Sequence, residues 1–196
     1  MTRRQGVGLG VTVLVLALTC FSVARVFVSL RRQAPVARAK RLIVQLQQGH
    51  AQERARAAVS LGILRHPLAV EPLIQALKDD DPELRATAAW ALTQIGDLRA
   101  LGPLTEALKD SHPDVRSYAA GGLGSLKDPS ALAPLVAALK DANFGVRAAA
   151  AEALGNLGDA RAVGPLTQAL KDLNHYVREE AAEALRTIER SNPPAP

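Results

Sequence analysis

Four histidines and one cysteine are the side chains of this sequence most suited to bind a metal ion or to act as a nucleophile. The histidines are His50, His66, His112 and His175, and the residues that follow them are Ala51, Pro67, Pro113 and Tyr176. None of these neighbours is acidic, so no His-Glu pair is available to hold a metal. Cys20 has no second cysteine, which excludes a disulfide framework or a Cys-based metal site.

Motifs that carry enzyme chemistry are also missing from the sequence. It contains no Gly-x-Ser-x-Gly, no phosphate-binding loop, no Cys-x-x-Cys and no His-Glu-x-x-His. The aspartates and glutamates recur at a regular spacing instead of converging on one place. We therefore expect no catalytic residues, no metal and no cofactor, and we predict that the protein is not an enzyme.

The regular spacing comes from an internal repeat of 31 residues. Lines that begin at Ala69, Ala100, Ala131 and Ala162 align without a gap and share eleven identical columns. In the first line these columns are Ala69, Pro72, Leu73, Ala76, Leu77, Lys78, Asp79, Arg85, Ala88, Ala89 and Leu92. A divergent copy at residues 38–68 precedes them and is typical of a capping repeat.

Each line contains the apolar pattern of two helices. In the second repeat the first helix places Val70, Leu73, Ile74 and Leu77 on one face, and the second places Leu84, Ala88, Ala91, Leu92 and Ile95 on one face. The turn between them ends with Asp81-Pro82, a good helix start. Gly96 and Gly158 mark helix ends. Pro72 lies early in the first helix, where it starts the helix late or kinks it.

A helix pair this short has two apolar faces and cannot bury both by itself, so neighbouring pairs must stack. Hydrophobic residues make up 48% of the chain and aromatic residues only 3%, which favours a core of closely packed helices. The sequence therefore predicts an all-α fold, an α-solenoid of about five repeats. The repeats are residues 38–68, 69–99, 100–130, 131–161 and 162–192, followed by a tail at 193–196.

The unit A-x-x-P-L-x-x-A-L-x-D, followed by an arginine in the second helix, resembles HEAT repeats, and in particular the short variant of the phycobilisome lyases. The resemblance covers residues 38–192. It implies a ladder of charges between neighbouring repeats, with a structural role. The ladder residues would be Asp79, Arg85, Asp110, Arg116, Asp141, Arg147, Asp172 and Arg178. The first repeat keeps Arg54 but has Gln48, which is expected to weaken the ladder there.

Two groups of HEAT-like proteins are enzymes. The deoxyhypusine hydroxylases bind di-iron through His-Glu pairs, which this sequence lacks. The phycobilisome lyases attach chromophores, but the likeness to them concerns the scaffold, which many HEAT-like proteins share. An enzyme or enzyme subunit of the lyase type is therefore the alternative, and binding of another protein is the main hypothesis.

The candidate binding surface is the exposed side of the second helices, which in HEAT solenoids line the concave face. Its members, from four successive repeats, are Glu83, Thr87, Trp90, Gln94, Asp114, Tyr118, Gly121, Glu152 and Glu183. Trp90 and Tyr118 are expected near each other, beside a shallow place at Gly121. Alternatively, Trp90 folds onto Gly121 and Gly122 and only fills their missing volume. The glutamates suggest a basic or amphipathic partner segment.

Residues 6–24 form an uncharged apolar run of 19 residues, about 28 Å long as a helix and close to the thickness of a bilayer core. We expect a basic tail at 1–5, a transmembrane helix at 6–30 and a basic linker at 31–37. The excess of basic residues after the helix predicts a single-pass membrane protein with cytoplasmic repeats. Alternatively, the segment is a cleaved signal and the repeats are exported in soluble form.

The formal net charge of +5 does not indicate nucleic-acid binding. Residues 1–41 hold eight basic and no acidic residues, so the rest of the chain carries a net charge of −3. Binding to a phosphate backbone needs basic residues on the folded surface. We predict no nucleic acid and no small-molecule substrate among the partners, and a membrane-anchored scaffold for another protein.

Overall fold

The structure, a computed structural model, describes residues 34–191. The chain divides into two units, residues 1–38 and 39–196. Of the first unit only residues 34–38 are described, and they are helical. The expected transmembrane segment 6–30 lies outside the described residues. Within 34–191, no helix has the length and apolar character that crossing a bilayer requires.

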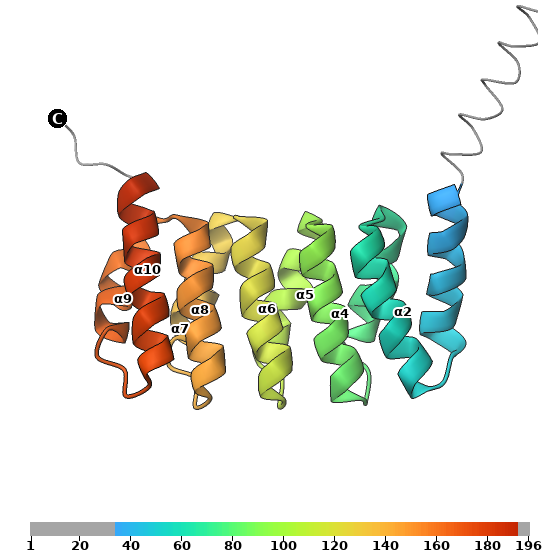
Figure 1. The fold of residues 1–196 in the computed structure, drawn as a ribbon, viewed down its shortest axis with the longest axis horizontal. Helices are drawn as coiled ribbons and strands as arrows, with labels where there is room; N and C mark the ends of the chain where they lie inside the picture. The colour runs from blue at the N-terminus through green and yellow to red at the C-terminus, as the bar shows by residue number, and fades with distance from the viewer. Residues whose placement is uncertain (1–33, 192–196) are drawn as a thin grey trace, which may run out of the picture. The chain divides into compact units, whose positions relative to one another are not determined.

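The second unit is a row of helix pairs, and the part described is all-α (Figure 1). Residues 39–48 are helical and precede α2. The long second helices are α2 (Ala51–Leu64), α4 (Pro82–Ile95), α6 (Pro113–Leu126), α8 (Phe144–Leu157) and α10 (His175–Ser191). The short first helices are α3 (Val70–Ala76), α5 (Leu101–Ala107), α7 (Leu132–Ala138) and α9 (Val163–Ala169). The predicted solenoid of helix pairs is confirmed.

A short 3-10 helix precedes each short helix, and the sequence did not indicate it. These are η1 (Pro67–Ala69), η2 (Leu98–Ala100), η3 (Pro129–Ala131) and η4 (Ala160–Ala162). Pro72 is the third residue of α3, so its missing N–H falls in the first turn, where no intrahelical acceptor exists. The proline column therefore lies where the ring is tolerated, and the α-helix begins only after a 3-10 turn.

Side chains at the expected positions start the second helices. The carboxylate of Asp81 accepts a hydrogen bond from the Glu83 backbone N–H at 3.0 Å. His112, Asn143 and Asn174 accept equivalent bonds in the following repeats. Gly96 and Gly158 end α4 and α8 in the left-handed conformation, with φ of 71° and 72°.

The second helices approach each other almost backbone to backbone. A Cβ added at Gly124 would lie 2.5 Å from the Cα of Ala153 in the next helix, and one at Gly155 would lie 2.7 Å from the Cα of Ala184. Only small residues permit this distance. In the equivalent column of α4 stands Thr93, and the facing residue in α6 is then Gly122, whose added Cβ would meet the Thr93 hydroxyl at 2.6 Å. The glycine at position 122 therefore makes room for the larger side chain of Thr93.

The last described helix carries charge where the inner helices carry small residues. Glu179 and Arg186 of α10 occupy the columns of Ala148 and Gly155, which lie on α8. Both charged side chains are exposed, and the Arg186 Nε donates to Glu183 Oε2 at 2.8 Å. This edge of α10 therefore differs from the tightly packed seams between α4, α6 and α8.

Candidate functional site

The candidate surface runs across the second helices, which form the front layer in Figure 1. Glu83, Asp114, Tyr118, Glu152 and Glu183 are exposed. Thr87, Trp90, Gln94 and Gly121 are half-buried. The Thr87 hydroxyl donates to the backbone oxygen of Glu83 at 2.7 Å, so its hydrogen bond is satisfied within α4. The named residues thus share one face, but they differ in how much of each side chain a partner could touch.

The position of Trp90 differs from one of the two alternatives drawn from the sequence. A Cβ built at Gly62 of α2 would lie 2.8 Å from the Cζ3 atom of Trp90, so the indole rests on the preceding helix. The space around Gly121 is open, because a Cβ there would have no atom within 4 Å. The idea that Trp90 fills the volume missing at Gly121 and Gly122 is therefore wrong.

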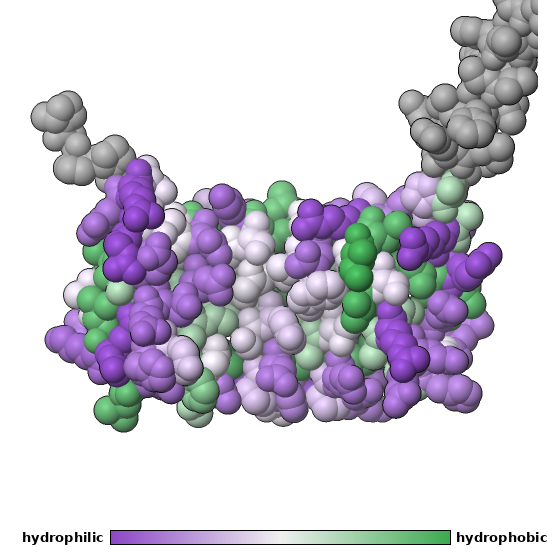
Figure 2. All heavy atoms as spheres, in the orientation of Figure 1, coloured by the Kyte–Doolittle hydropathy of each residue, from purple (hydrophilic) through white to green (hydrophobic). Residues whose placement is uncertain are grey.

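Two exposed apolar residues of α2 were missed in the sequence. Val59 is 37% exposed and Ile63 is 70% exposed, and they lie four residues apart on one face. They occupy the columns of Trp90 and Gln94, so extending the repeat register back by 31 residues would have found them. Figure 2 shows an apolar stripe on this face between α2 and α4. An apolar surface therefore marks the N-terminal end of the candidate site.

The opposite end of the same face is acidic. Glu152 of α8 and Glu180 of α10 have no cationic group within ion-pair distance among residues 34–191. Glu183 binds Arg186, which lowers the pKa of the glutamate. The pKa of Glu180 is raised, first by burial and then by repulsion from Glu152, Glu179 and Glu183. Uncompensated negative charge is thus concentrated between α8 and α10.

Replacing Glu180 by glutamine should stabilise the protein slightly at pH 7. A carboxylate whose pKa is raised on folding loses free energy in its charged form, and this cost disappears as the pH falls through its pKa. We expect Glu180→Gln to raise the free energy of unfolding by about 0.5 kcal/mol at pH 7, with no gain at pH 3. Denaturant titration at both pH values measures this. As a control, Glu106→Gln removes a carboxylate that is paired with Lys109 and should give no gain.

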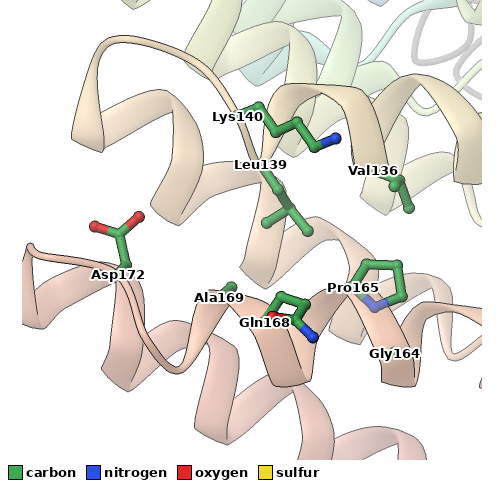
Figure 3. Close-up of a pocket in the computed structure, with 8 residues that line it drawn as sticks. All are labelled: Val136, Leu139, Lys140, Gly164, Pro165, Gln168, Ala169 and Asp172. Atoms are coloured by element: carbon green, nitrogen blue, oxygen red, sulfur yellow. The ribbon is translucent and has the colours of Figure 1, made fainter.

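Shallow grooves lie between the short helices. One of about 500 Å³ between α7 and α9 is lined by Val136, Leu139, Lys140, Gly164, Pro165, Gln168, Ala169 and Asp172. Figure 3 shows apolar side chains from both helices at this groove, with Lys140 and Asp172 at its edge. Similar grooves of about 350 and 480 Å³ lie between α3 and α5 and between α5 and α7. They recur because the short helices of successive repeats lie side by side in the same register.

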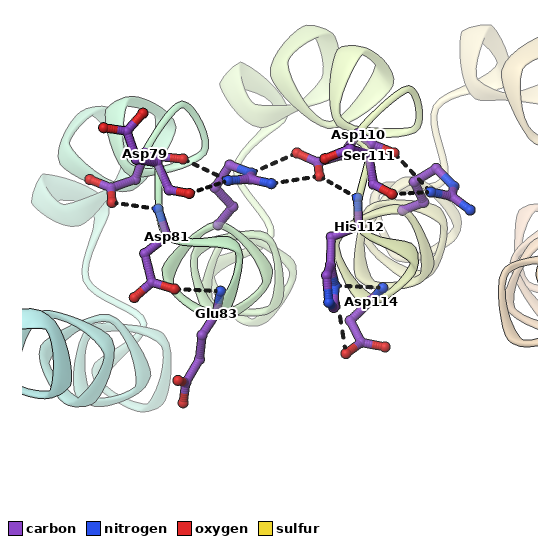
Figure 4. A network of polar contacts seen from close by, with 10 residues as sticks. Asp79, Asp81, Glu83, Asp110, Ser111, His112 and Asp114 are labelled. Atoms are coloured by element: carbon purple, nitrogen blue, oxygen red, sulfur yellow. Dashed lines mark hydrogen bonds and ion pairs between the residues drawn. The ribbon is translucent and has the colours of Figure 1, made fainter.

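Arginines and aspartates of the turns join successive repeats. The Nε and Nη2 atoms of Arg85 donate to the two carboxylate oxygens of Asp110 at 2.7 and 2.9 Å. Its Nη1 donates to the backbone oxygens of Asp79 and Asp80 at 2.8 and 3.0 Å (Figure 4). Each arginine therefore uses one edge for its own turn and the other for the turn of the next repeat.

The same arrangement repeats along the solenoid. Arg116 binds Asp141 and Arg147 binds Asp172, each through two bonds of 2.7 to 2.9 Å. Arg54 binds Asp79, although the first repeat has Gln48 in the aspartate column. Arg178 donates to the backbone oxygens of Asp172 and Leu173. The carboxylate partner of each arginine comes from the following repeat, so Gln48 leaves the bond from Arg54 intact.

The aspartates and arginines of the ladder stabilise each other in their charged forms. Hydrogen bonds from Arg85, Arg116 and Arg147 lower the pKa of Asp110, Asp141 and Asp172, and the carboxylates in turn raise the pKa of these arginines. Asp110 also accepts the His112 backbone N–H at 2.8 Å. A carboxylate held ionised in this way is a poor general acid, because it releases its proton well below neutral pH. The geometry therefore favours a structural role.

The histidines lie at helix ends. His112 caps α6, His66 caps η1, and the rings of His175 and Tyr176 lie 3.9 Å apart. Among residues 34–191, no three His, Cys, Asp or Glu side chains are close enough together to hold a metal ion. Asp97 and Asp159 cap η2 and η4 and bind Arg99 and Arg161, which lowers the pKa of each aspartate to about 2.

The described residues thus form an α-solenoid of helix pairs joined by an arginine–aspartate ladder. The model of the family described as HEAT repeats matches residues 39–112 and 101–186. The chain belongs to the HEAT-repeat family. No curated protein matches it.

Solved structures show the same architecture. The chain is similar to a chain in the complex of CpcE and CpcF of phycocyanin lyase from Nostoc sp. PCC7120, with 29% identity and a TM-score of 0.70. That match covers 78% of this chain and 65% of the other, so this chain spans less than two thirds of it. A designed armadillo repeat protein in complex with the peptide (KR)4 matches with 22% identity and a TM-score of 0.62, covering 81% and 84%.

Proposed function

We propose that this HEAT-repeat protein is a scaffold that binds a segment of another protein across its second helices. The observation that carries the proposal is the composition of this face, which combines exposed apolar side chains on α2 with unpaired carboxylates on α8 and α10. Isolated apolar residues are common on surfaces, but a cluster of exposed aliphatic side chains beside an aromatic side chain is typical of binding sites. The chain similar to this one at 29% identity belongs to a complex of two proteins.

We also propose that residues 6–30 hold the scaffold at a membrane as a single helix, with the repeats on the cytoplasmic side. The support is the uncharged run of residues 6–24 and the basic residues that follow it. Cell fractionation of the full chain and of a chain without residues 1–34 tests this. Membrane association of only the full chain is expected. If the full chain is instead shortened at its N-terminus and released into an exported fraction, the segment is a cleaved signal.

A second candidate function is that of a subunit of a chromophore lyase, and the similarity to the phycocyanin lyase complex favours it. The charges of the ladder offer no catalytic group for this, since each carboxylate is bound by an arginine. Visible absorbance of the purified protein, before and after mixing with a bilin, separates the two functions. A covalent coloured adduct would support the lyase function.

Crosslinking tests the binding face directly. A photoreactive side chain at Tyr118, which is 46% exposed, should form an adduct with a partner in intact membranes. The same group at Leu98, which is also exposed but lies in η2, is the matched control and should give none. Trp90→Ala should weaken the adduct at position 118 by tenfold or more, because central aromatic residues dominate such interfaces. Equal adducts from both positions would contradict the proposal.

Trp90→Ala needs a folding control, because the indole also packs on Gly62. Circular dichroism of the variant should retain the helical signal of the parent. If the signal is lost, the tryptophan acts in packing, and its loss says nothing about binding. Ile63→Asp, at a side chain of the same face that is 70% exposed, then provides the same test.

A further inference from the structure

The binding face changes character along the row of helices. At α2 it offers Val59 and Ile63, and Trp90 lies against Gly62, which stands between them in the helix. In the middle it offers Tyr118 and the open space at Gly121. At α8 and α10 it offers acidic side chains. The two ends of one surface therefore favour different chemical groups, and a segment that fits both ends must itself be asymmetric.

We propose that the partner segment is amphipathic and lies in one fixed direction, with an apolar side chain at the α2–α4 seam and basic side chains at the α8–α10 seam. This rests on the proposed function and specifies the kind of segment that is bound. The structure commits to a basic protein segment because Glu152 and Glu180 have no cationic partner among residues 34–191. A nucleic acid or an anionic lipid surface would be repelled there.

Charge also opposes the reverse direction. The α2 end carries Arg56 and Arg65, which are exposed, and Arg65 donates to the side chain of Gln94 at 3.2 Å. A basic stretch placed over α2 would meet these guanidinium groups and the apolar stripe instead of carboxylates. An apolar stretch placed over the α8–α10 seam would cover Glu152 and Glu180, which have no cationic partner among residues 34–191, and remove them from water. Both mismatches vanish when the segment is turned round.

Helix spacing gives the length of the segment. Neighbouring packed helices lie about 8 to 10 Å apart, so the two seams are separated by about 24 to 30 Å. An extended chain advances about 3.3 Å per residue, and roughly eight residues cover that distance. The inferred ligand is therefore an extended segment with a large apolar residue about eight positions from a pair of Lys or Arg residues.

Trp90 is the only tryptophan of the chain and reports on the apolar end. The probe is a synthetic peptide with Leu-Leu at one end, eight Gly and Ser residues, and Lys-Arg-Lys-Arg at the other end. It carries a nitroxide quencher beside either the leucines or the basic residues. With the full chain in detergent micelles, the quencher beside the leucines should reduce Trp90 emission at least threefold more than the quencher beside the basic residues.

Variants of the full chain complete the test. Ile63→Asp should weaken peptide binding tenfold or more, and the pair Glu152→Gln and Glu180→Gln should weaken it severalfold and reduce its dependence on salt. Leu98→Asp and Glu106→Gln, which change an exposed apolar residue and an acid elsewhere, are the matched controls and should leave binding unchanged. Quenching that is equal from both ends, or no peptide binding at 1 mM, overturns the inference.

The failure of this inference differs from the failure of the proposed function. If Tyr118 crosslinks a partner in membranes but the peptide shows no preferred direction, the face binds a segment of other chemistry and only the inference falls. If Tyr118 crosslinks nothing more than Leu98 does, the scaffold function itself falls.

Discussion

Gly124→Ala should lower the free energy of unfolding by about 2 kcal/mol, whereas Gly121→Ala, on the same helix, should raise it by up to about 1 kcal/mol. The added methyl at Gly124 would lie 2.5 Å from the Cα of Ala153, and a backbone atom cannot move aside as a flexible side chain can. The added methyl at Gly121 would meet no atom within 4 Å. There the gain is the usual one of replacing glycine inside a helix.

Denaturant unfolding of both variants, followed by circular dichroism, measures the two effects. The signs of the two effects are more decisive than their magnitudes. Helix propensity alone would change the stability in the same direction at two positions three residues apart, so opposite signs exclude it as the cause. A fully buried alanine of the same helix provides a second check: Ala120→Leu should cost about 1 to 3 kcal/mol by overpacking. If Gly124→Ala stabilises the protein as Gly121→Ala does, the close approach of α6 and α8 is wrong.

Arg116→Met should lower the free energy of unfolding by about 2 to 3 kcal/mol at pH 7. The arginine makes two bonds to Asp141 and two to the backbone oxygens of Asp110 and Ser111. The side chains of Arg116 and Asp141 are only 15% and 14% exposed, so the aspartate left behind would be poorly hydrated. Methionine keeps the apolar stem of the side chain, so the change tests the polar contacts.

Arg178→Met is the matched control. Arg178 makes the two bonds to the backbone oxygens, but it is exposed and forms no ion pair with a carboxylate among residues 34–191. We expect a cost of less than about 1 kcal/mol. Equal costs for Arg116→Met and Arg178→Met would show that the bond to the next repeat contributes nothing.

The pH dependence of stability tests the same ladder. Aspartates whose pKa is lowered on folding stabilise the protein above their pKa in the unfolded chain, about 4, and this stabilisation is lost as the pH falls through the lower folded value. The parent should therefore lose stability progressively below about pH 4. The difference between the parent and Arg116→Met should shrink over the same range, because protonated Asp141 no longer gains from its arginine.

The repeat made the fold predictable from sequence. Identical residues at a spacing of 31, with apolar faces of helical period, leave stacked helix pairs as the only way to bury both faces. Asp81 and Gly96 stand at a helix start and a helix end because their side-chain and backbone preferences are local. Arg65 and Lys127 also adopt the left-handed conformation, with φ of 51° and 53°, and their residue types gave no signal of this.

Contacts between repeats were harder to predict from the sequence. The sequence placed aspartate and arginine in one ladder, but only the geometry shows that Arg85 binds Asp110 of the next repeat and the backbone of its own turn. The direction of Trp90 depends on Gly62, a residue 28 positions away that the helical pattern of α4 does not contain. The exposed apolar residues Val59 and Ile63 of α2 were missed because the register of the candidate surface was not extended back to the first repeat. The N-terminal segment 6–30 remains an expectation from composition.

The exposed charges of α10 limit how the solenoid could have grown. Duplicating a unit from the interior, such as residues 100–130, would reproduce both a small-residue column and an aspartate for the preceding arginine, so the new copy could join its neighbours at once. A unit added after α10 would meet Arg186 where an inner helix offers Gly155. A duplicate of an interior unit would therefore join its neighbours more readily than a unit placed directly after α10.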